Sequence, residues 1–381
     1  MSLAAMVSTA PQGAPTSYFV SRLAMTSFRS YDAAEVVSDG RPIVFWGPNG
    51  AGKTNILEAL SLLAPGRGLR SAKFGDAMRR VAGNDPRPWS VAGRIVRAGD
   101  EVALRTGVDG NERREVRIDG EKAAPGDLAS HVRLLWLTPA MDRLFTDSPG
   151  GRRRFLDRMV LGFDAEHARD TATYEKALRE RQKLLNEHRD EPSWLESLEE
   201  TMAEAGIAIA ARRENLLHRL AAAIAEAESA FPRATLALEE GFEPSDAEDF
   251  ARALFDARHR DQAAGRGTVG PQRADLRVRH EEKDMPAADC STGEQKALLI
   301  GLVLANARLQ AVTHGGAPPL LLLDEIAAHL DEERRAALFD EICALGAQAW
   351  MTGTDAALFN ALETRAQQFE VKDGQIRCQS E

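Results

Sequence analysis

The sequence predicts an α/β protein, a mixed sheet with an antiparallel β-meander, into which an all-helical segment is inserted. A glycine-rich loop lies between an apolar run, 43–46, and a helical pattern that begins at Ile56. Short alternating runs between 91 and 118 are separated by turn signals, which indicates a meander. From 151 to 264 the residues Ala, Glu, Arg and Leu dominate, so this part is expected to be helical.

These changes of character divide the chain into four parts. Residues 1–17 mix Ala, Ser, Thr, Pro, Gly and Gln without a basic start or a long apolar segment. Such a stretch predicts a disordered leader rather than a signal peptide. The α/β head is expected over 18–150 and 265–381, and the helical arm over 151–264.

Long periodic runs predict the elements of the arm and of the second head segment. An apolar series with 3-4 spacing predicts a helix over about 193–230, which Gly206 could interrupt. Unbroken, this helix would be roughly 55 Å long. Strands are expected at 132–137, 320–323 and 349–351, followed by a hairpin around Asp373-Gly374.

Composition excludes several classes of protein. The chain of 381 residues is 44% hydrophobic and 28% charged, an ordinary soluble composition. Its cysteines, Cys290, Cys343 and Cys378, form no CxxC pair, which argues against a zinc site and fits a reducing cytoplasm. The apolar runs are shorter than a membrane span, so no membrane partner is expected. A net charge of −10 argues against DNA binding through overall charge, but it leaves room for a local basic surface.

The glycine-rich loop has the Gly-x4-Gly-Lys-Thr spacing that is typical of a phosphate-binding loop. Its glycines let the backbone wrap closely, so that successive N–H groups face phosphate oxygens. Lys53 would bring a positive charge to the β- and γ-phosphates, and the Thr54 hydroxyl would bind Mg²⁺. We therefore expect a nucleoside triphosphate to be held by Gly47, Pro48, Asn49, Gly50, Ala51, Gly52, Lys53, Thr54 and Asn55.

Two carboxylates follow the apolar strand at 320–323. A continuous apolar run is typical of a parallel strand buried on both faces, and ligands bind at the carboxyl ends of such strands. Asp324 is therefore expected to bind Mg²⁺ together with Thr54, and Glu325 is expected to act as the general base on the attacking water. Upstream, Ser291 and Gly293 open a strongly apolar helix, as either a plain N-cap or an anion-binding site.

This combination of motifs resembles the ATP-binding-cassette superfamily. The resemblance implies that ATP is the nucleotide and that two heads sandwich it in a head-to-tail homodimer. Ser291, Gly293 and Gln295 would then contact the γ-phosphate bound by the second copy. The spacing between Lys53 and Asp324 leaves room for an inserted arm, as in the chromosome-maintenance and DNA-repair branch.

Within that branch the chain resembles the RecF family over most of its length. The segments that carry the resemblance are Ser27–Tyr31, Gly47–Leu57, Gly66–Arg70, Ser148–Asp157, Gly270–Leu276, Ser291–Lys296 and Thr352–Asp355. Gln272 and Ala274 depart from the family's Gly-Pro-His-Arg-Asp-Asp pattern. The resemblance implies a weak, DNA-stimulated ATPase that binds double-stranded DNA at gap junctions. It also implies RecO and RecR mediator proteins as partners in loading the strand-exchange protein.

Two basic groups are candidates for the DNA contact. One consists of Arg67, Arg70 and Lys73, and the other of Arg152, Arg153 and Arg154. Arginines that contact the phosphate backbone give affinity without sequence preference. Each group could equally be a solvated face or a set of internal ion pairs.

Two other functions are weighed against this one. A nucleotide-binding subunit of a transporter would not carry the long helical insertion, and the switch histidine of that class is missing. An SMC-type chromosome-organising ATPase would need a long coiled coil with a hinge, for which the helical stretch is too short.

Overall fold

The computed structural model describes residues 18–80, 87–108, 113–187, 191–239 and 245–379, so the predicted leader lies outside the described residues. The chain forms two compact units, which we call the head unit and the arm unit. The head unit comprises Met1–Asp142, Ala223–Arg233 and Ser291–Glu381, and the arm unit comprises Arg143–Ala222 and Ala234–Cys290. The predicted borders at 150/151 and 264/265 lie within the arm unit.

The first sheet of the head unit carries the predicted nucleotide motifs. Its strand order is β15-β14-β3-β13-β12-β8, and all neighbours are parallel except the hairpin of β14 and β15. The strands are β3 (Ile43–Trp46), β8 (Leu134–Leu137), β12 (Leu320–Leu323), β13 (Ala349–Gly353), β14 (Gln367–Lys372) and β15 (Gln375–Cys378). Strand β13 therefore lies between the strand before the phosphate loop and the strand before the two carboxylates. The strands predicted at 132–137, 320–323 and 349–351 are confirmed.

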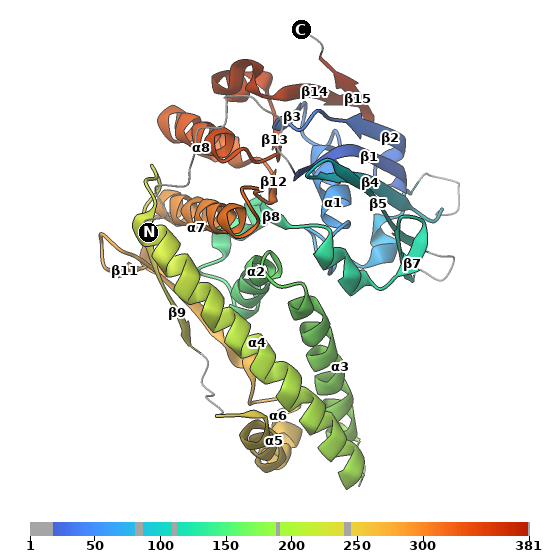
Figure 1. The fold of residues 1–381 in the computed structure, drawn as a ribbon, viewed down its shortest axis with the longest axis vertical. Helices are drawn as coiled ribbons and strands as arrows, with labels where there is room; N and C mark the ends of the chain where they lie inside the picture. The colour runs from blue at the N-terminus through green and yellow to red at the C-terminus, as the bar shows by residue number, and fades with distance from the viewer. Residues whose placement is uncertain (1–17, 81–86, 109–112, 188–190, 240–244, 380–381) are drawn as a thin grey trace. The chain divides into compact units, whose positions relative to one another are not determined.

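The second sheet of the head unit is the predicted meander, preceded by a hairpin. Its order is β2-β1-β4-β5-β6-β7, and all neighbours are antiparallel (Figure 1). The strands are β1 (Tyr18–Phe28), β2 (Tyr31–Val37), β4 (Ser90–Arg97), β5 (Asp100–Val108), β6 (Arg114–Ile118) and β7 (Glu121–Ala123).

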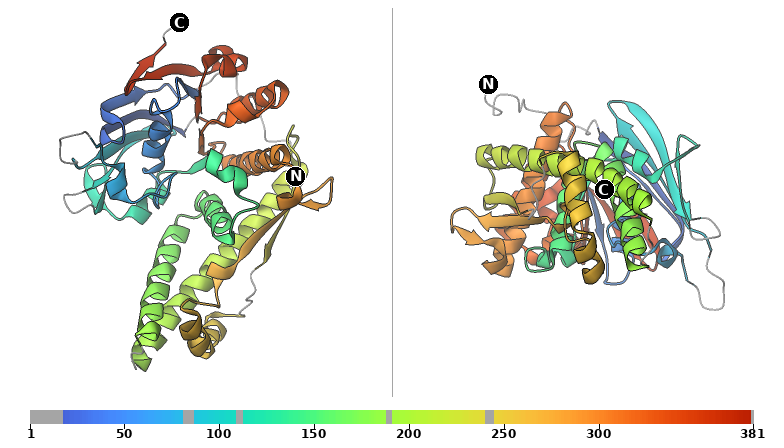
Figure 2. Two further views of the ribbon diagram at one scale, coloured as in Figure 1. Left: turned by 180° about the vertical axis from the view of Figure 1, so that it is seen from behind. Right: turned by 90° about the horizontal axis from the view of Figure 1, so that it is seen from below.

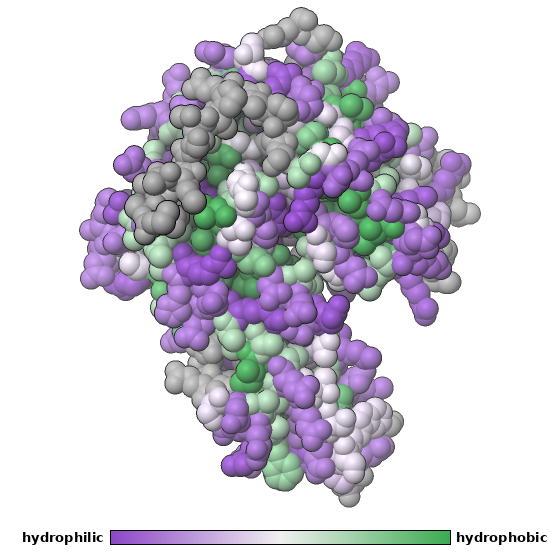
Figure 3. All heavy atoms as spheres, viewed as in Figure 1, coloured by the Kyte–Doolittle hydropathy of each residue, from purple (hydrophilic) through white to green (hydrophobic). Residues whose placement is uncertain are grey.

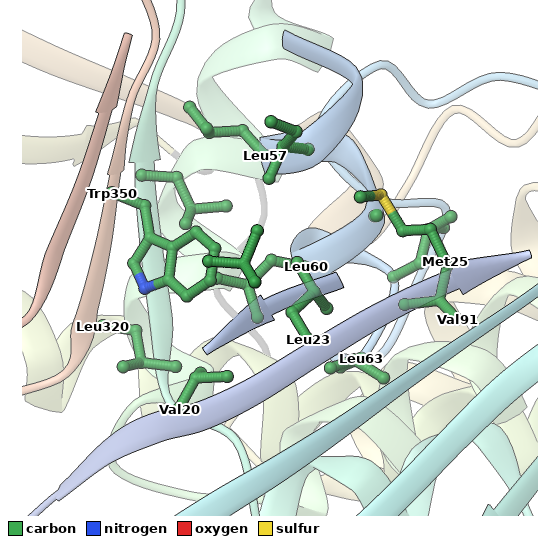
Figure 4. Close-up of a cluster of buried hydrophobic side chains, with 14 of the residues drawn as sticks. Val20, Leu23, Met25, Leu57, Leu60, Leu63, Val91, Leu320 and Trp350 are labelled. Atoms are coloured by element: carbon green, nitrogen blue, oxygen red, sulfur yellow. The ribbon is translucent and has the colours of Figure 1, made fainter. Parts of the chain in front are cut away.

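Helix α1 (Lys53–Ser61) fills the space between the two sheets and forms the core of the head unit. From Ile56 to Ser61 every residue of the helix is buried. Figure 4 shows the leucines of this segment against β1 and β4 on one side and against β12 and β13 on the other. The labelled residues there are Val20, Leu23, Met25, Leu57, Leu60, Leu63, Val91, Leu320 and Trp350. Burial of these side chains holds the phosphate loop, which begins α1, in a fixed place.

Helix α7 (Thr292–Thr313) and helix α8 (Glu332–Leu345) complete the head unit (Figure 2). By length and hydropathy α7 could cross a membrane, but 72% of its apolar window is buried within the structure. Core helices of this kind pass the same test. No other helix of the described residues meets that criterion.

The arm unit contains most of the predicted helices. They are α2 (Pro149–Leu161), α3 (Glu166–Asn186), α4 (Pro192–Glu226), α5 (Ala247–Asp256) and α6 (Arg258–Ala264), and the last residues of α4, from Ala223 on, belong to the head unit. Gly206 does not interrupt α4. A Cβ at this position would lie 2.4 Å from Phe250 and 3.2 Å from Tyr174, so only glycine fits there. The glycine allows α4 to pack closely on these aromatic rings, and the helix continues for 35 residues.

The arm unit also contains strands, which corrects the prediction that 151–264 is helical throughout. A three-stranded sheet of order β11-β10-β9 is formed by β9 (Ala234–Glu239), β10 (Asp275–His280) and β11 (Met285–Pro286). Strand β9 lies within the range predicted to be helical. Its residues alternate in exposure, and a run of only six residues gives a weak signal beside a 35-residue helix.

Candidate nucleotide-binding site

The phosphate loop connects β3 to α1 in the predicted manner. Gly47, Gly50 and Gly52 all have positive φ, at 151°, 82° and 111°. A Cβ on Gly47 would lie 2.1 Å from the Val371 carbonyl oxygen, and one on Gly52 would lie 2.7 Å from the Ser30 hydroxyl. Side chains at these two positions would therefore push the loop away from its neighbours.

Lys53 is held inside the loop that it is expected to serve. It is 4% exposed, and its Nζ donates to the Gly47 carbonyl at 2.8 Å and to the Pro48 carbonyl at 3.0 Å. Partial burial lowers the pKa of Lys53, while the negative charges of Glu325 and Asp324 act in the opposite direction. The ammonium thus faces two carboxylates across the loop, and bound phosphates would add to this negative charge.

Thr54 and Asp324 are brought into direct contact across 270 residues of sequence. The Thr54 hydroxyl lies 2.9 Å from one carboxylate oxygen of Asp324 and 3.1 Å from the other. Both are hard oxygen ligands, which suit Mg²⁺. Among the described residues no cluster of three His, Cys, Asp or Glu side chains could hold a metal without further ligands. A cation at this pair would therefore need phosphate or water oxygens, which is how Mg²⁺ is bound beside nucleotides.

Thr352, at the end of β13, connects the two carboxylate residues. Its hydroxyl donates to Asp324 at 2.7 Å and accepts from the Glu325 backbone N–H at 2.9 Å. The side chain of Thr352 is fully buried, so the hydroxyl has no water to compete for it. Thr352 thereby fixes both the orientation of Asp324 and the turn that carries Glu325.

Glu325 begins the turn after β12 with a left-handed backbone, φ 52° and ψ 22°. This conformation is unusual for a residue other than glycine and is found at functional sites. The side chain is partly exposed. Among the described residues no hydrogen bond or ion pair to its carboxylate is recorded, which suits a group that must accept a proton from water.

The serine-led segment caps helix α7. Ser291 accepts from the Glu294 backbone N–H, and the Glu294 carboxylate accepts from the Ser291 backbone N–H at 3.0 Å, forming a capping box. Ser291 and Gly293 are exposed, and a Cβ on Gly293 would meet nothing within 4 Å. Gln295 is 6% exposed, so it would have to be uncovered before it could contact a second copy.

A buried ion pair beside α1 was not predicted from the sequence. Glu58 is 2% exposed, and Arg29 donates to its two oxygens at 2.9 and 2.5 Å. Arg70 approaches the same carboxylate at 3.1 Å. The sequence could have indicated this pair, because Glu58 stands among the apolar residues of a helix expected to be buried, and a buried carboxylate needs a cationic partner.

The predicted DNA-contact residues have different environments. Arg67 and Lys73 are exposed, and Arg70 is partly drawn toward the Glu58 carboxylate. Hydrophilic side chains predominate on the face of the molecule drawn in Figure 3.

In the second group only two of the three arginines are accessible. Arg154 is exposed and Arg153 is partly exposed. Arg152 is 7% exposed, donates to Asp275 at 2.7 and 3.0 Å, and also donates to three backbone carbonyls. Its guanidinium is fully engaged inside the arm unit, so the predicted DNA contact of Arg152 does not fit the structure.

The head unit therefore has the architecture of an ATP-binding-cassette ATPase head. The sequence model of the RecF/RecN/SMC N terminal domain matches residues 19–377. A relative from Rhizobium rhizogenes, named DNA replication and repair protein RecF, is 52% identical over 95% of this chain and 99% of its own length. A protein of the same name from Rhizobium leguminosarum bv. trifolii is 53% identical with the same coverage. The chain belongs to the RecF family.

Solved structures agree at the level of the fold. One is described as the recombination mediator protein RecF-ATPrS in the RecFOR pathway. It matches with a TM-score of 0.80 and 21% identity, over 97% of this chain and 100% of that chain. The Smc head domain with an extended coiled coil from Pyrococcus furiosus matches with a TM-score of 0.55 and 17% identity, over 96% of both chains. The predicted fold class is thus confirmed.

Proposed function

We propose that this chain is an ATP-dependent DNA-binding protein of recombinational repair and replication. ATP binds at the phosphate loop, and two ATP-loaded copies pair so that Ser291 and Gly293 of each reach the nucleotide of the other. The dimer binds double-stranded DNA next to a single-stranded gap and helps RecO- and RecR-type proteins to load the strand-exchange recombinase. Slow hydrolysis releases the DNA. The curated relatives named RecF support the cellular role.

One observation carries the nucleotide site: Thr54, Asp324, Thr352 and Glu325 form a continuous chain of hydrogen bonds beside Lys53. When bound, Mg²⁺ would neutralise phosphate charge at Thr54 and Asp324. Lys53 would exchange its two loop carbonyls for phosphate oxygens. Glu325 would orient a water for in-line attack and accept its proton.

Hydrolysis at such a site is expected to be weak and stimulated by DNA. Lys53, Thr54, Asp324 and Glu325 belong to one copy, whereas the Ser291 and Gly293 that complete its site are those of the second copy. Turnover should therefore require dimerisation, and DNA that stabilises the dimer should raise the rate.

The test replaces the loop lysine by an uncharged residue of similar length, in Lys53→Met. Sedimentation is measured with and without ATP and Mg²⁺, and binding of a fluorescent ATP analogue is measured in parallel. We expect the wild-type chain to dimerise with ATP and Lys53→Met to stay monomeric with ATP affinity at least tenfold lower. Equal dimerisation of both proteins would show that the loop does not drive association.

A further inference from the structure

The start of α2 and the turn before β10 gather arginine side chains at one place in the arm unit. A Cβ on Gly150 would lie 3.6 Å from a terminal nitrogen of Arg154 and 3.7 Å from one of Arg153. Both guanidinium groups therefore reach back over the first turn of α2. Arg153 also donates to the Ala274 carbonyl at 2.8 Å, which places it beside the neighbouring residue, Arg273.

The carboxylates near this cluster are already paired with other arginines. Asp275 accepts two hydrogen bonds from Arg152 and forms a second ion pair with Arg277 at 3.2 Å. Asp157 accepts two hydrogen bonds from Arg213, at 2.8 and 2.9 Å. Because both acids are shared with other arginines, they offset the positive charges at the start of α2 only in part.

The cluster is exposed and its members repel one another. Arg154 and Arg273 are exposed, and within the described part of the chain neither has a recorded hydrogen bond or ion pair. Partial burial lowers the pKa of Arg153, and the positive charges of Arg213 and Arg273 lower it further, while the negative charges of Asp275 and Asp157 act in the opposite direction. Arg153 nevertheless stays charged at neutral pH, because an arginine titrates far above it. Like charges held together in this way favour a bound anion.

We propose that Arg153, Arg154 and Arg273 together bind a phosphate of the DNA backbone. This inference rests on the proposed DNA-binding function. It adds Arg273 to the predicted DNA contacts and removes Arg152 from them. Guanidinium groups match the geometry of a phosphate and pair with it in a bidentate manner. An exposed cluster of cations that offers no base-specific contact suits a backbone phosphate, which is bound without sequence preference.

The experiment measures binding of a fluorescent duplex by the ATP-loaded full chain at several salt concentrations. Arg154→Ala and Arg273→Ala are each expected to weaken binding about fivefold and to reduce the salt slope by about 1, as for one lost phosphate contact. Arg279→Ala is the matched control, because it removes the same charge from strand β10 at a residue that is paired with Asp284 at 2.8 Å and not with Asp275. It should bind within about twofold of the wild type and keep its salt slope.

Several results would overturn the proposal. Unchanged affinity and slope in Arg154→Ala and Arg273→Ala, with ATP-driven dimerisation intact, would remove the phosphate site and leave the proposed function standing. An equal loss of DNA affinity in Arg279→Ala would show that overall charge, and not this cluster, accounts for the effect. Failure of the wild type to bind DNA in any nucleotide state would overturn the proposed function itself.

Discussion

Thr352 offers the sharpest test of how the nucleotide site is organised, because one buried hydroxyl serves both carboxylate residues. Thr352→Val keeps the branched shape and nearly the same volume, so it leaves no cavity. It removes the hydrogen bond donated to Asp324 and the acceptor of the Glu325 backbone N–H. The change therefore isolates the polar role of a single atom.

The size of the effect follows from the two lost contacts. A hydrogen bond to a charged group contributes about 1.5–3 kcal/mol, and a buried N–H without a partner costs about 1–3 kcal/mol. Thr54 still holds Asp324, which softens the first loss. We expect Thr352→Val to lower the free energy of unfolding by about 3 kcal/mol, and Tm by roughly 6–12 °C for a unit of this size.

The same change should weaken the metal site. Loss of a residue that orients a ligand typically lowers metal affinity by about 10–100-fold. The assay is the rise in Tm with nucleotide as Mg²⁺ is titrated, which reports metal affinity separately from intrinsic stability. Thr352→Ser keeps the hydroxyl and should bind Mg²⁺ with nucleotide within about threefold of the wild type. If Thr352→Val binds Mg²⁺ and nucleotide as tightly as the wild type, the hydroxyl does not orient Asp324.

Three other predictions concern the catalytic base, the second copy and the arm. Glu325→Gln should bind ATP normally and remain a dimer, with turnover at least about 100-fold slower in a phosphate-release assay; wild-type turnover would exclude Glu325 as the base. Ser291→Arg should bind ATP with unchanged affinity yet stay monomeric in sedimentation, and normal dimerisation would remove the role of Ser291 across the interface. Burial alone would raise the pKa of Asp157, but the hydrogen bonds from His167 and Arg213 outweigh it and hold the pKa below its usual value. This contribution to stability is present above about pH 4 and is lost as pH falls through the lowered pKa. Asp157→Asn should therefore cost about 3 kcal/mol at pH 7 and flatten the acid limb of unfolding free energy against pH; parallel acid limbs would contradict it.

Two local sequence motifs were enough to predict the phosphate loop and the two carboxylates of the nucleotide site. The loop from Gly47 to Thr54 and the pair Asp324-Glu325 each have a local pattern, and parallel strands place both at one edge of the sheet. In the sequence, Thr352 stands out only as part of the segment Thr352–Asp355 that resembles the RecF family. Its role depends on the strand order, because β13 lies between β3 and β12. Strand order is set by long-range pairing, which no window of sequence contains.

Composition alone assigns all of Arg152, Arg153 and Arg154 to one basic surface, whereas helical geometry separates them by the direction in which each points. Successive residues on an α-helix point about 100° apart, so three adjacent arginines cannot all face one partner. In α2 the first points inward to Asp275, the second lies half-buried beside the turn before β10, and the third faces solvent. Helical periodicity could have predicted that one arginine of the three turns inward. It could not have named Asp275, which lies 123 residues away along the chain. Basic runs on helices should therefore be divided by face before any of their charges is assigned to DNA.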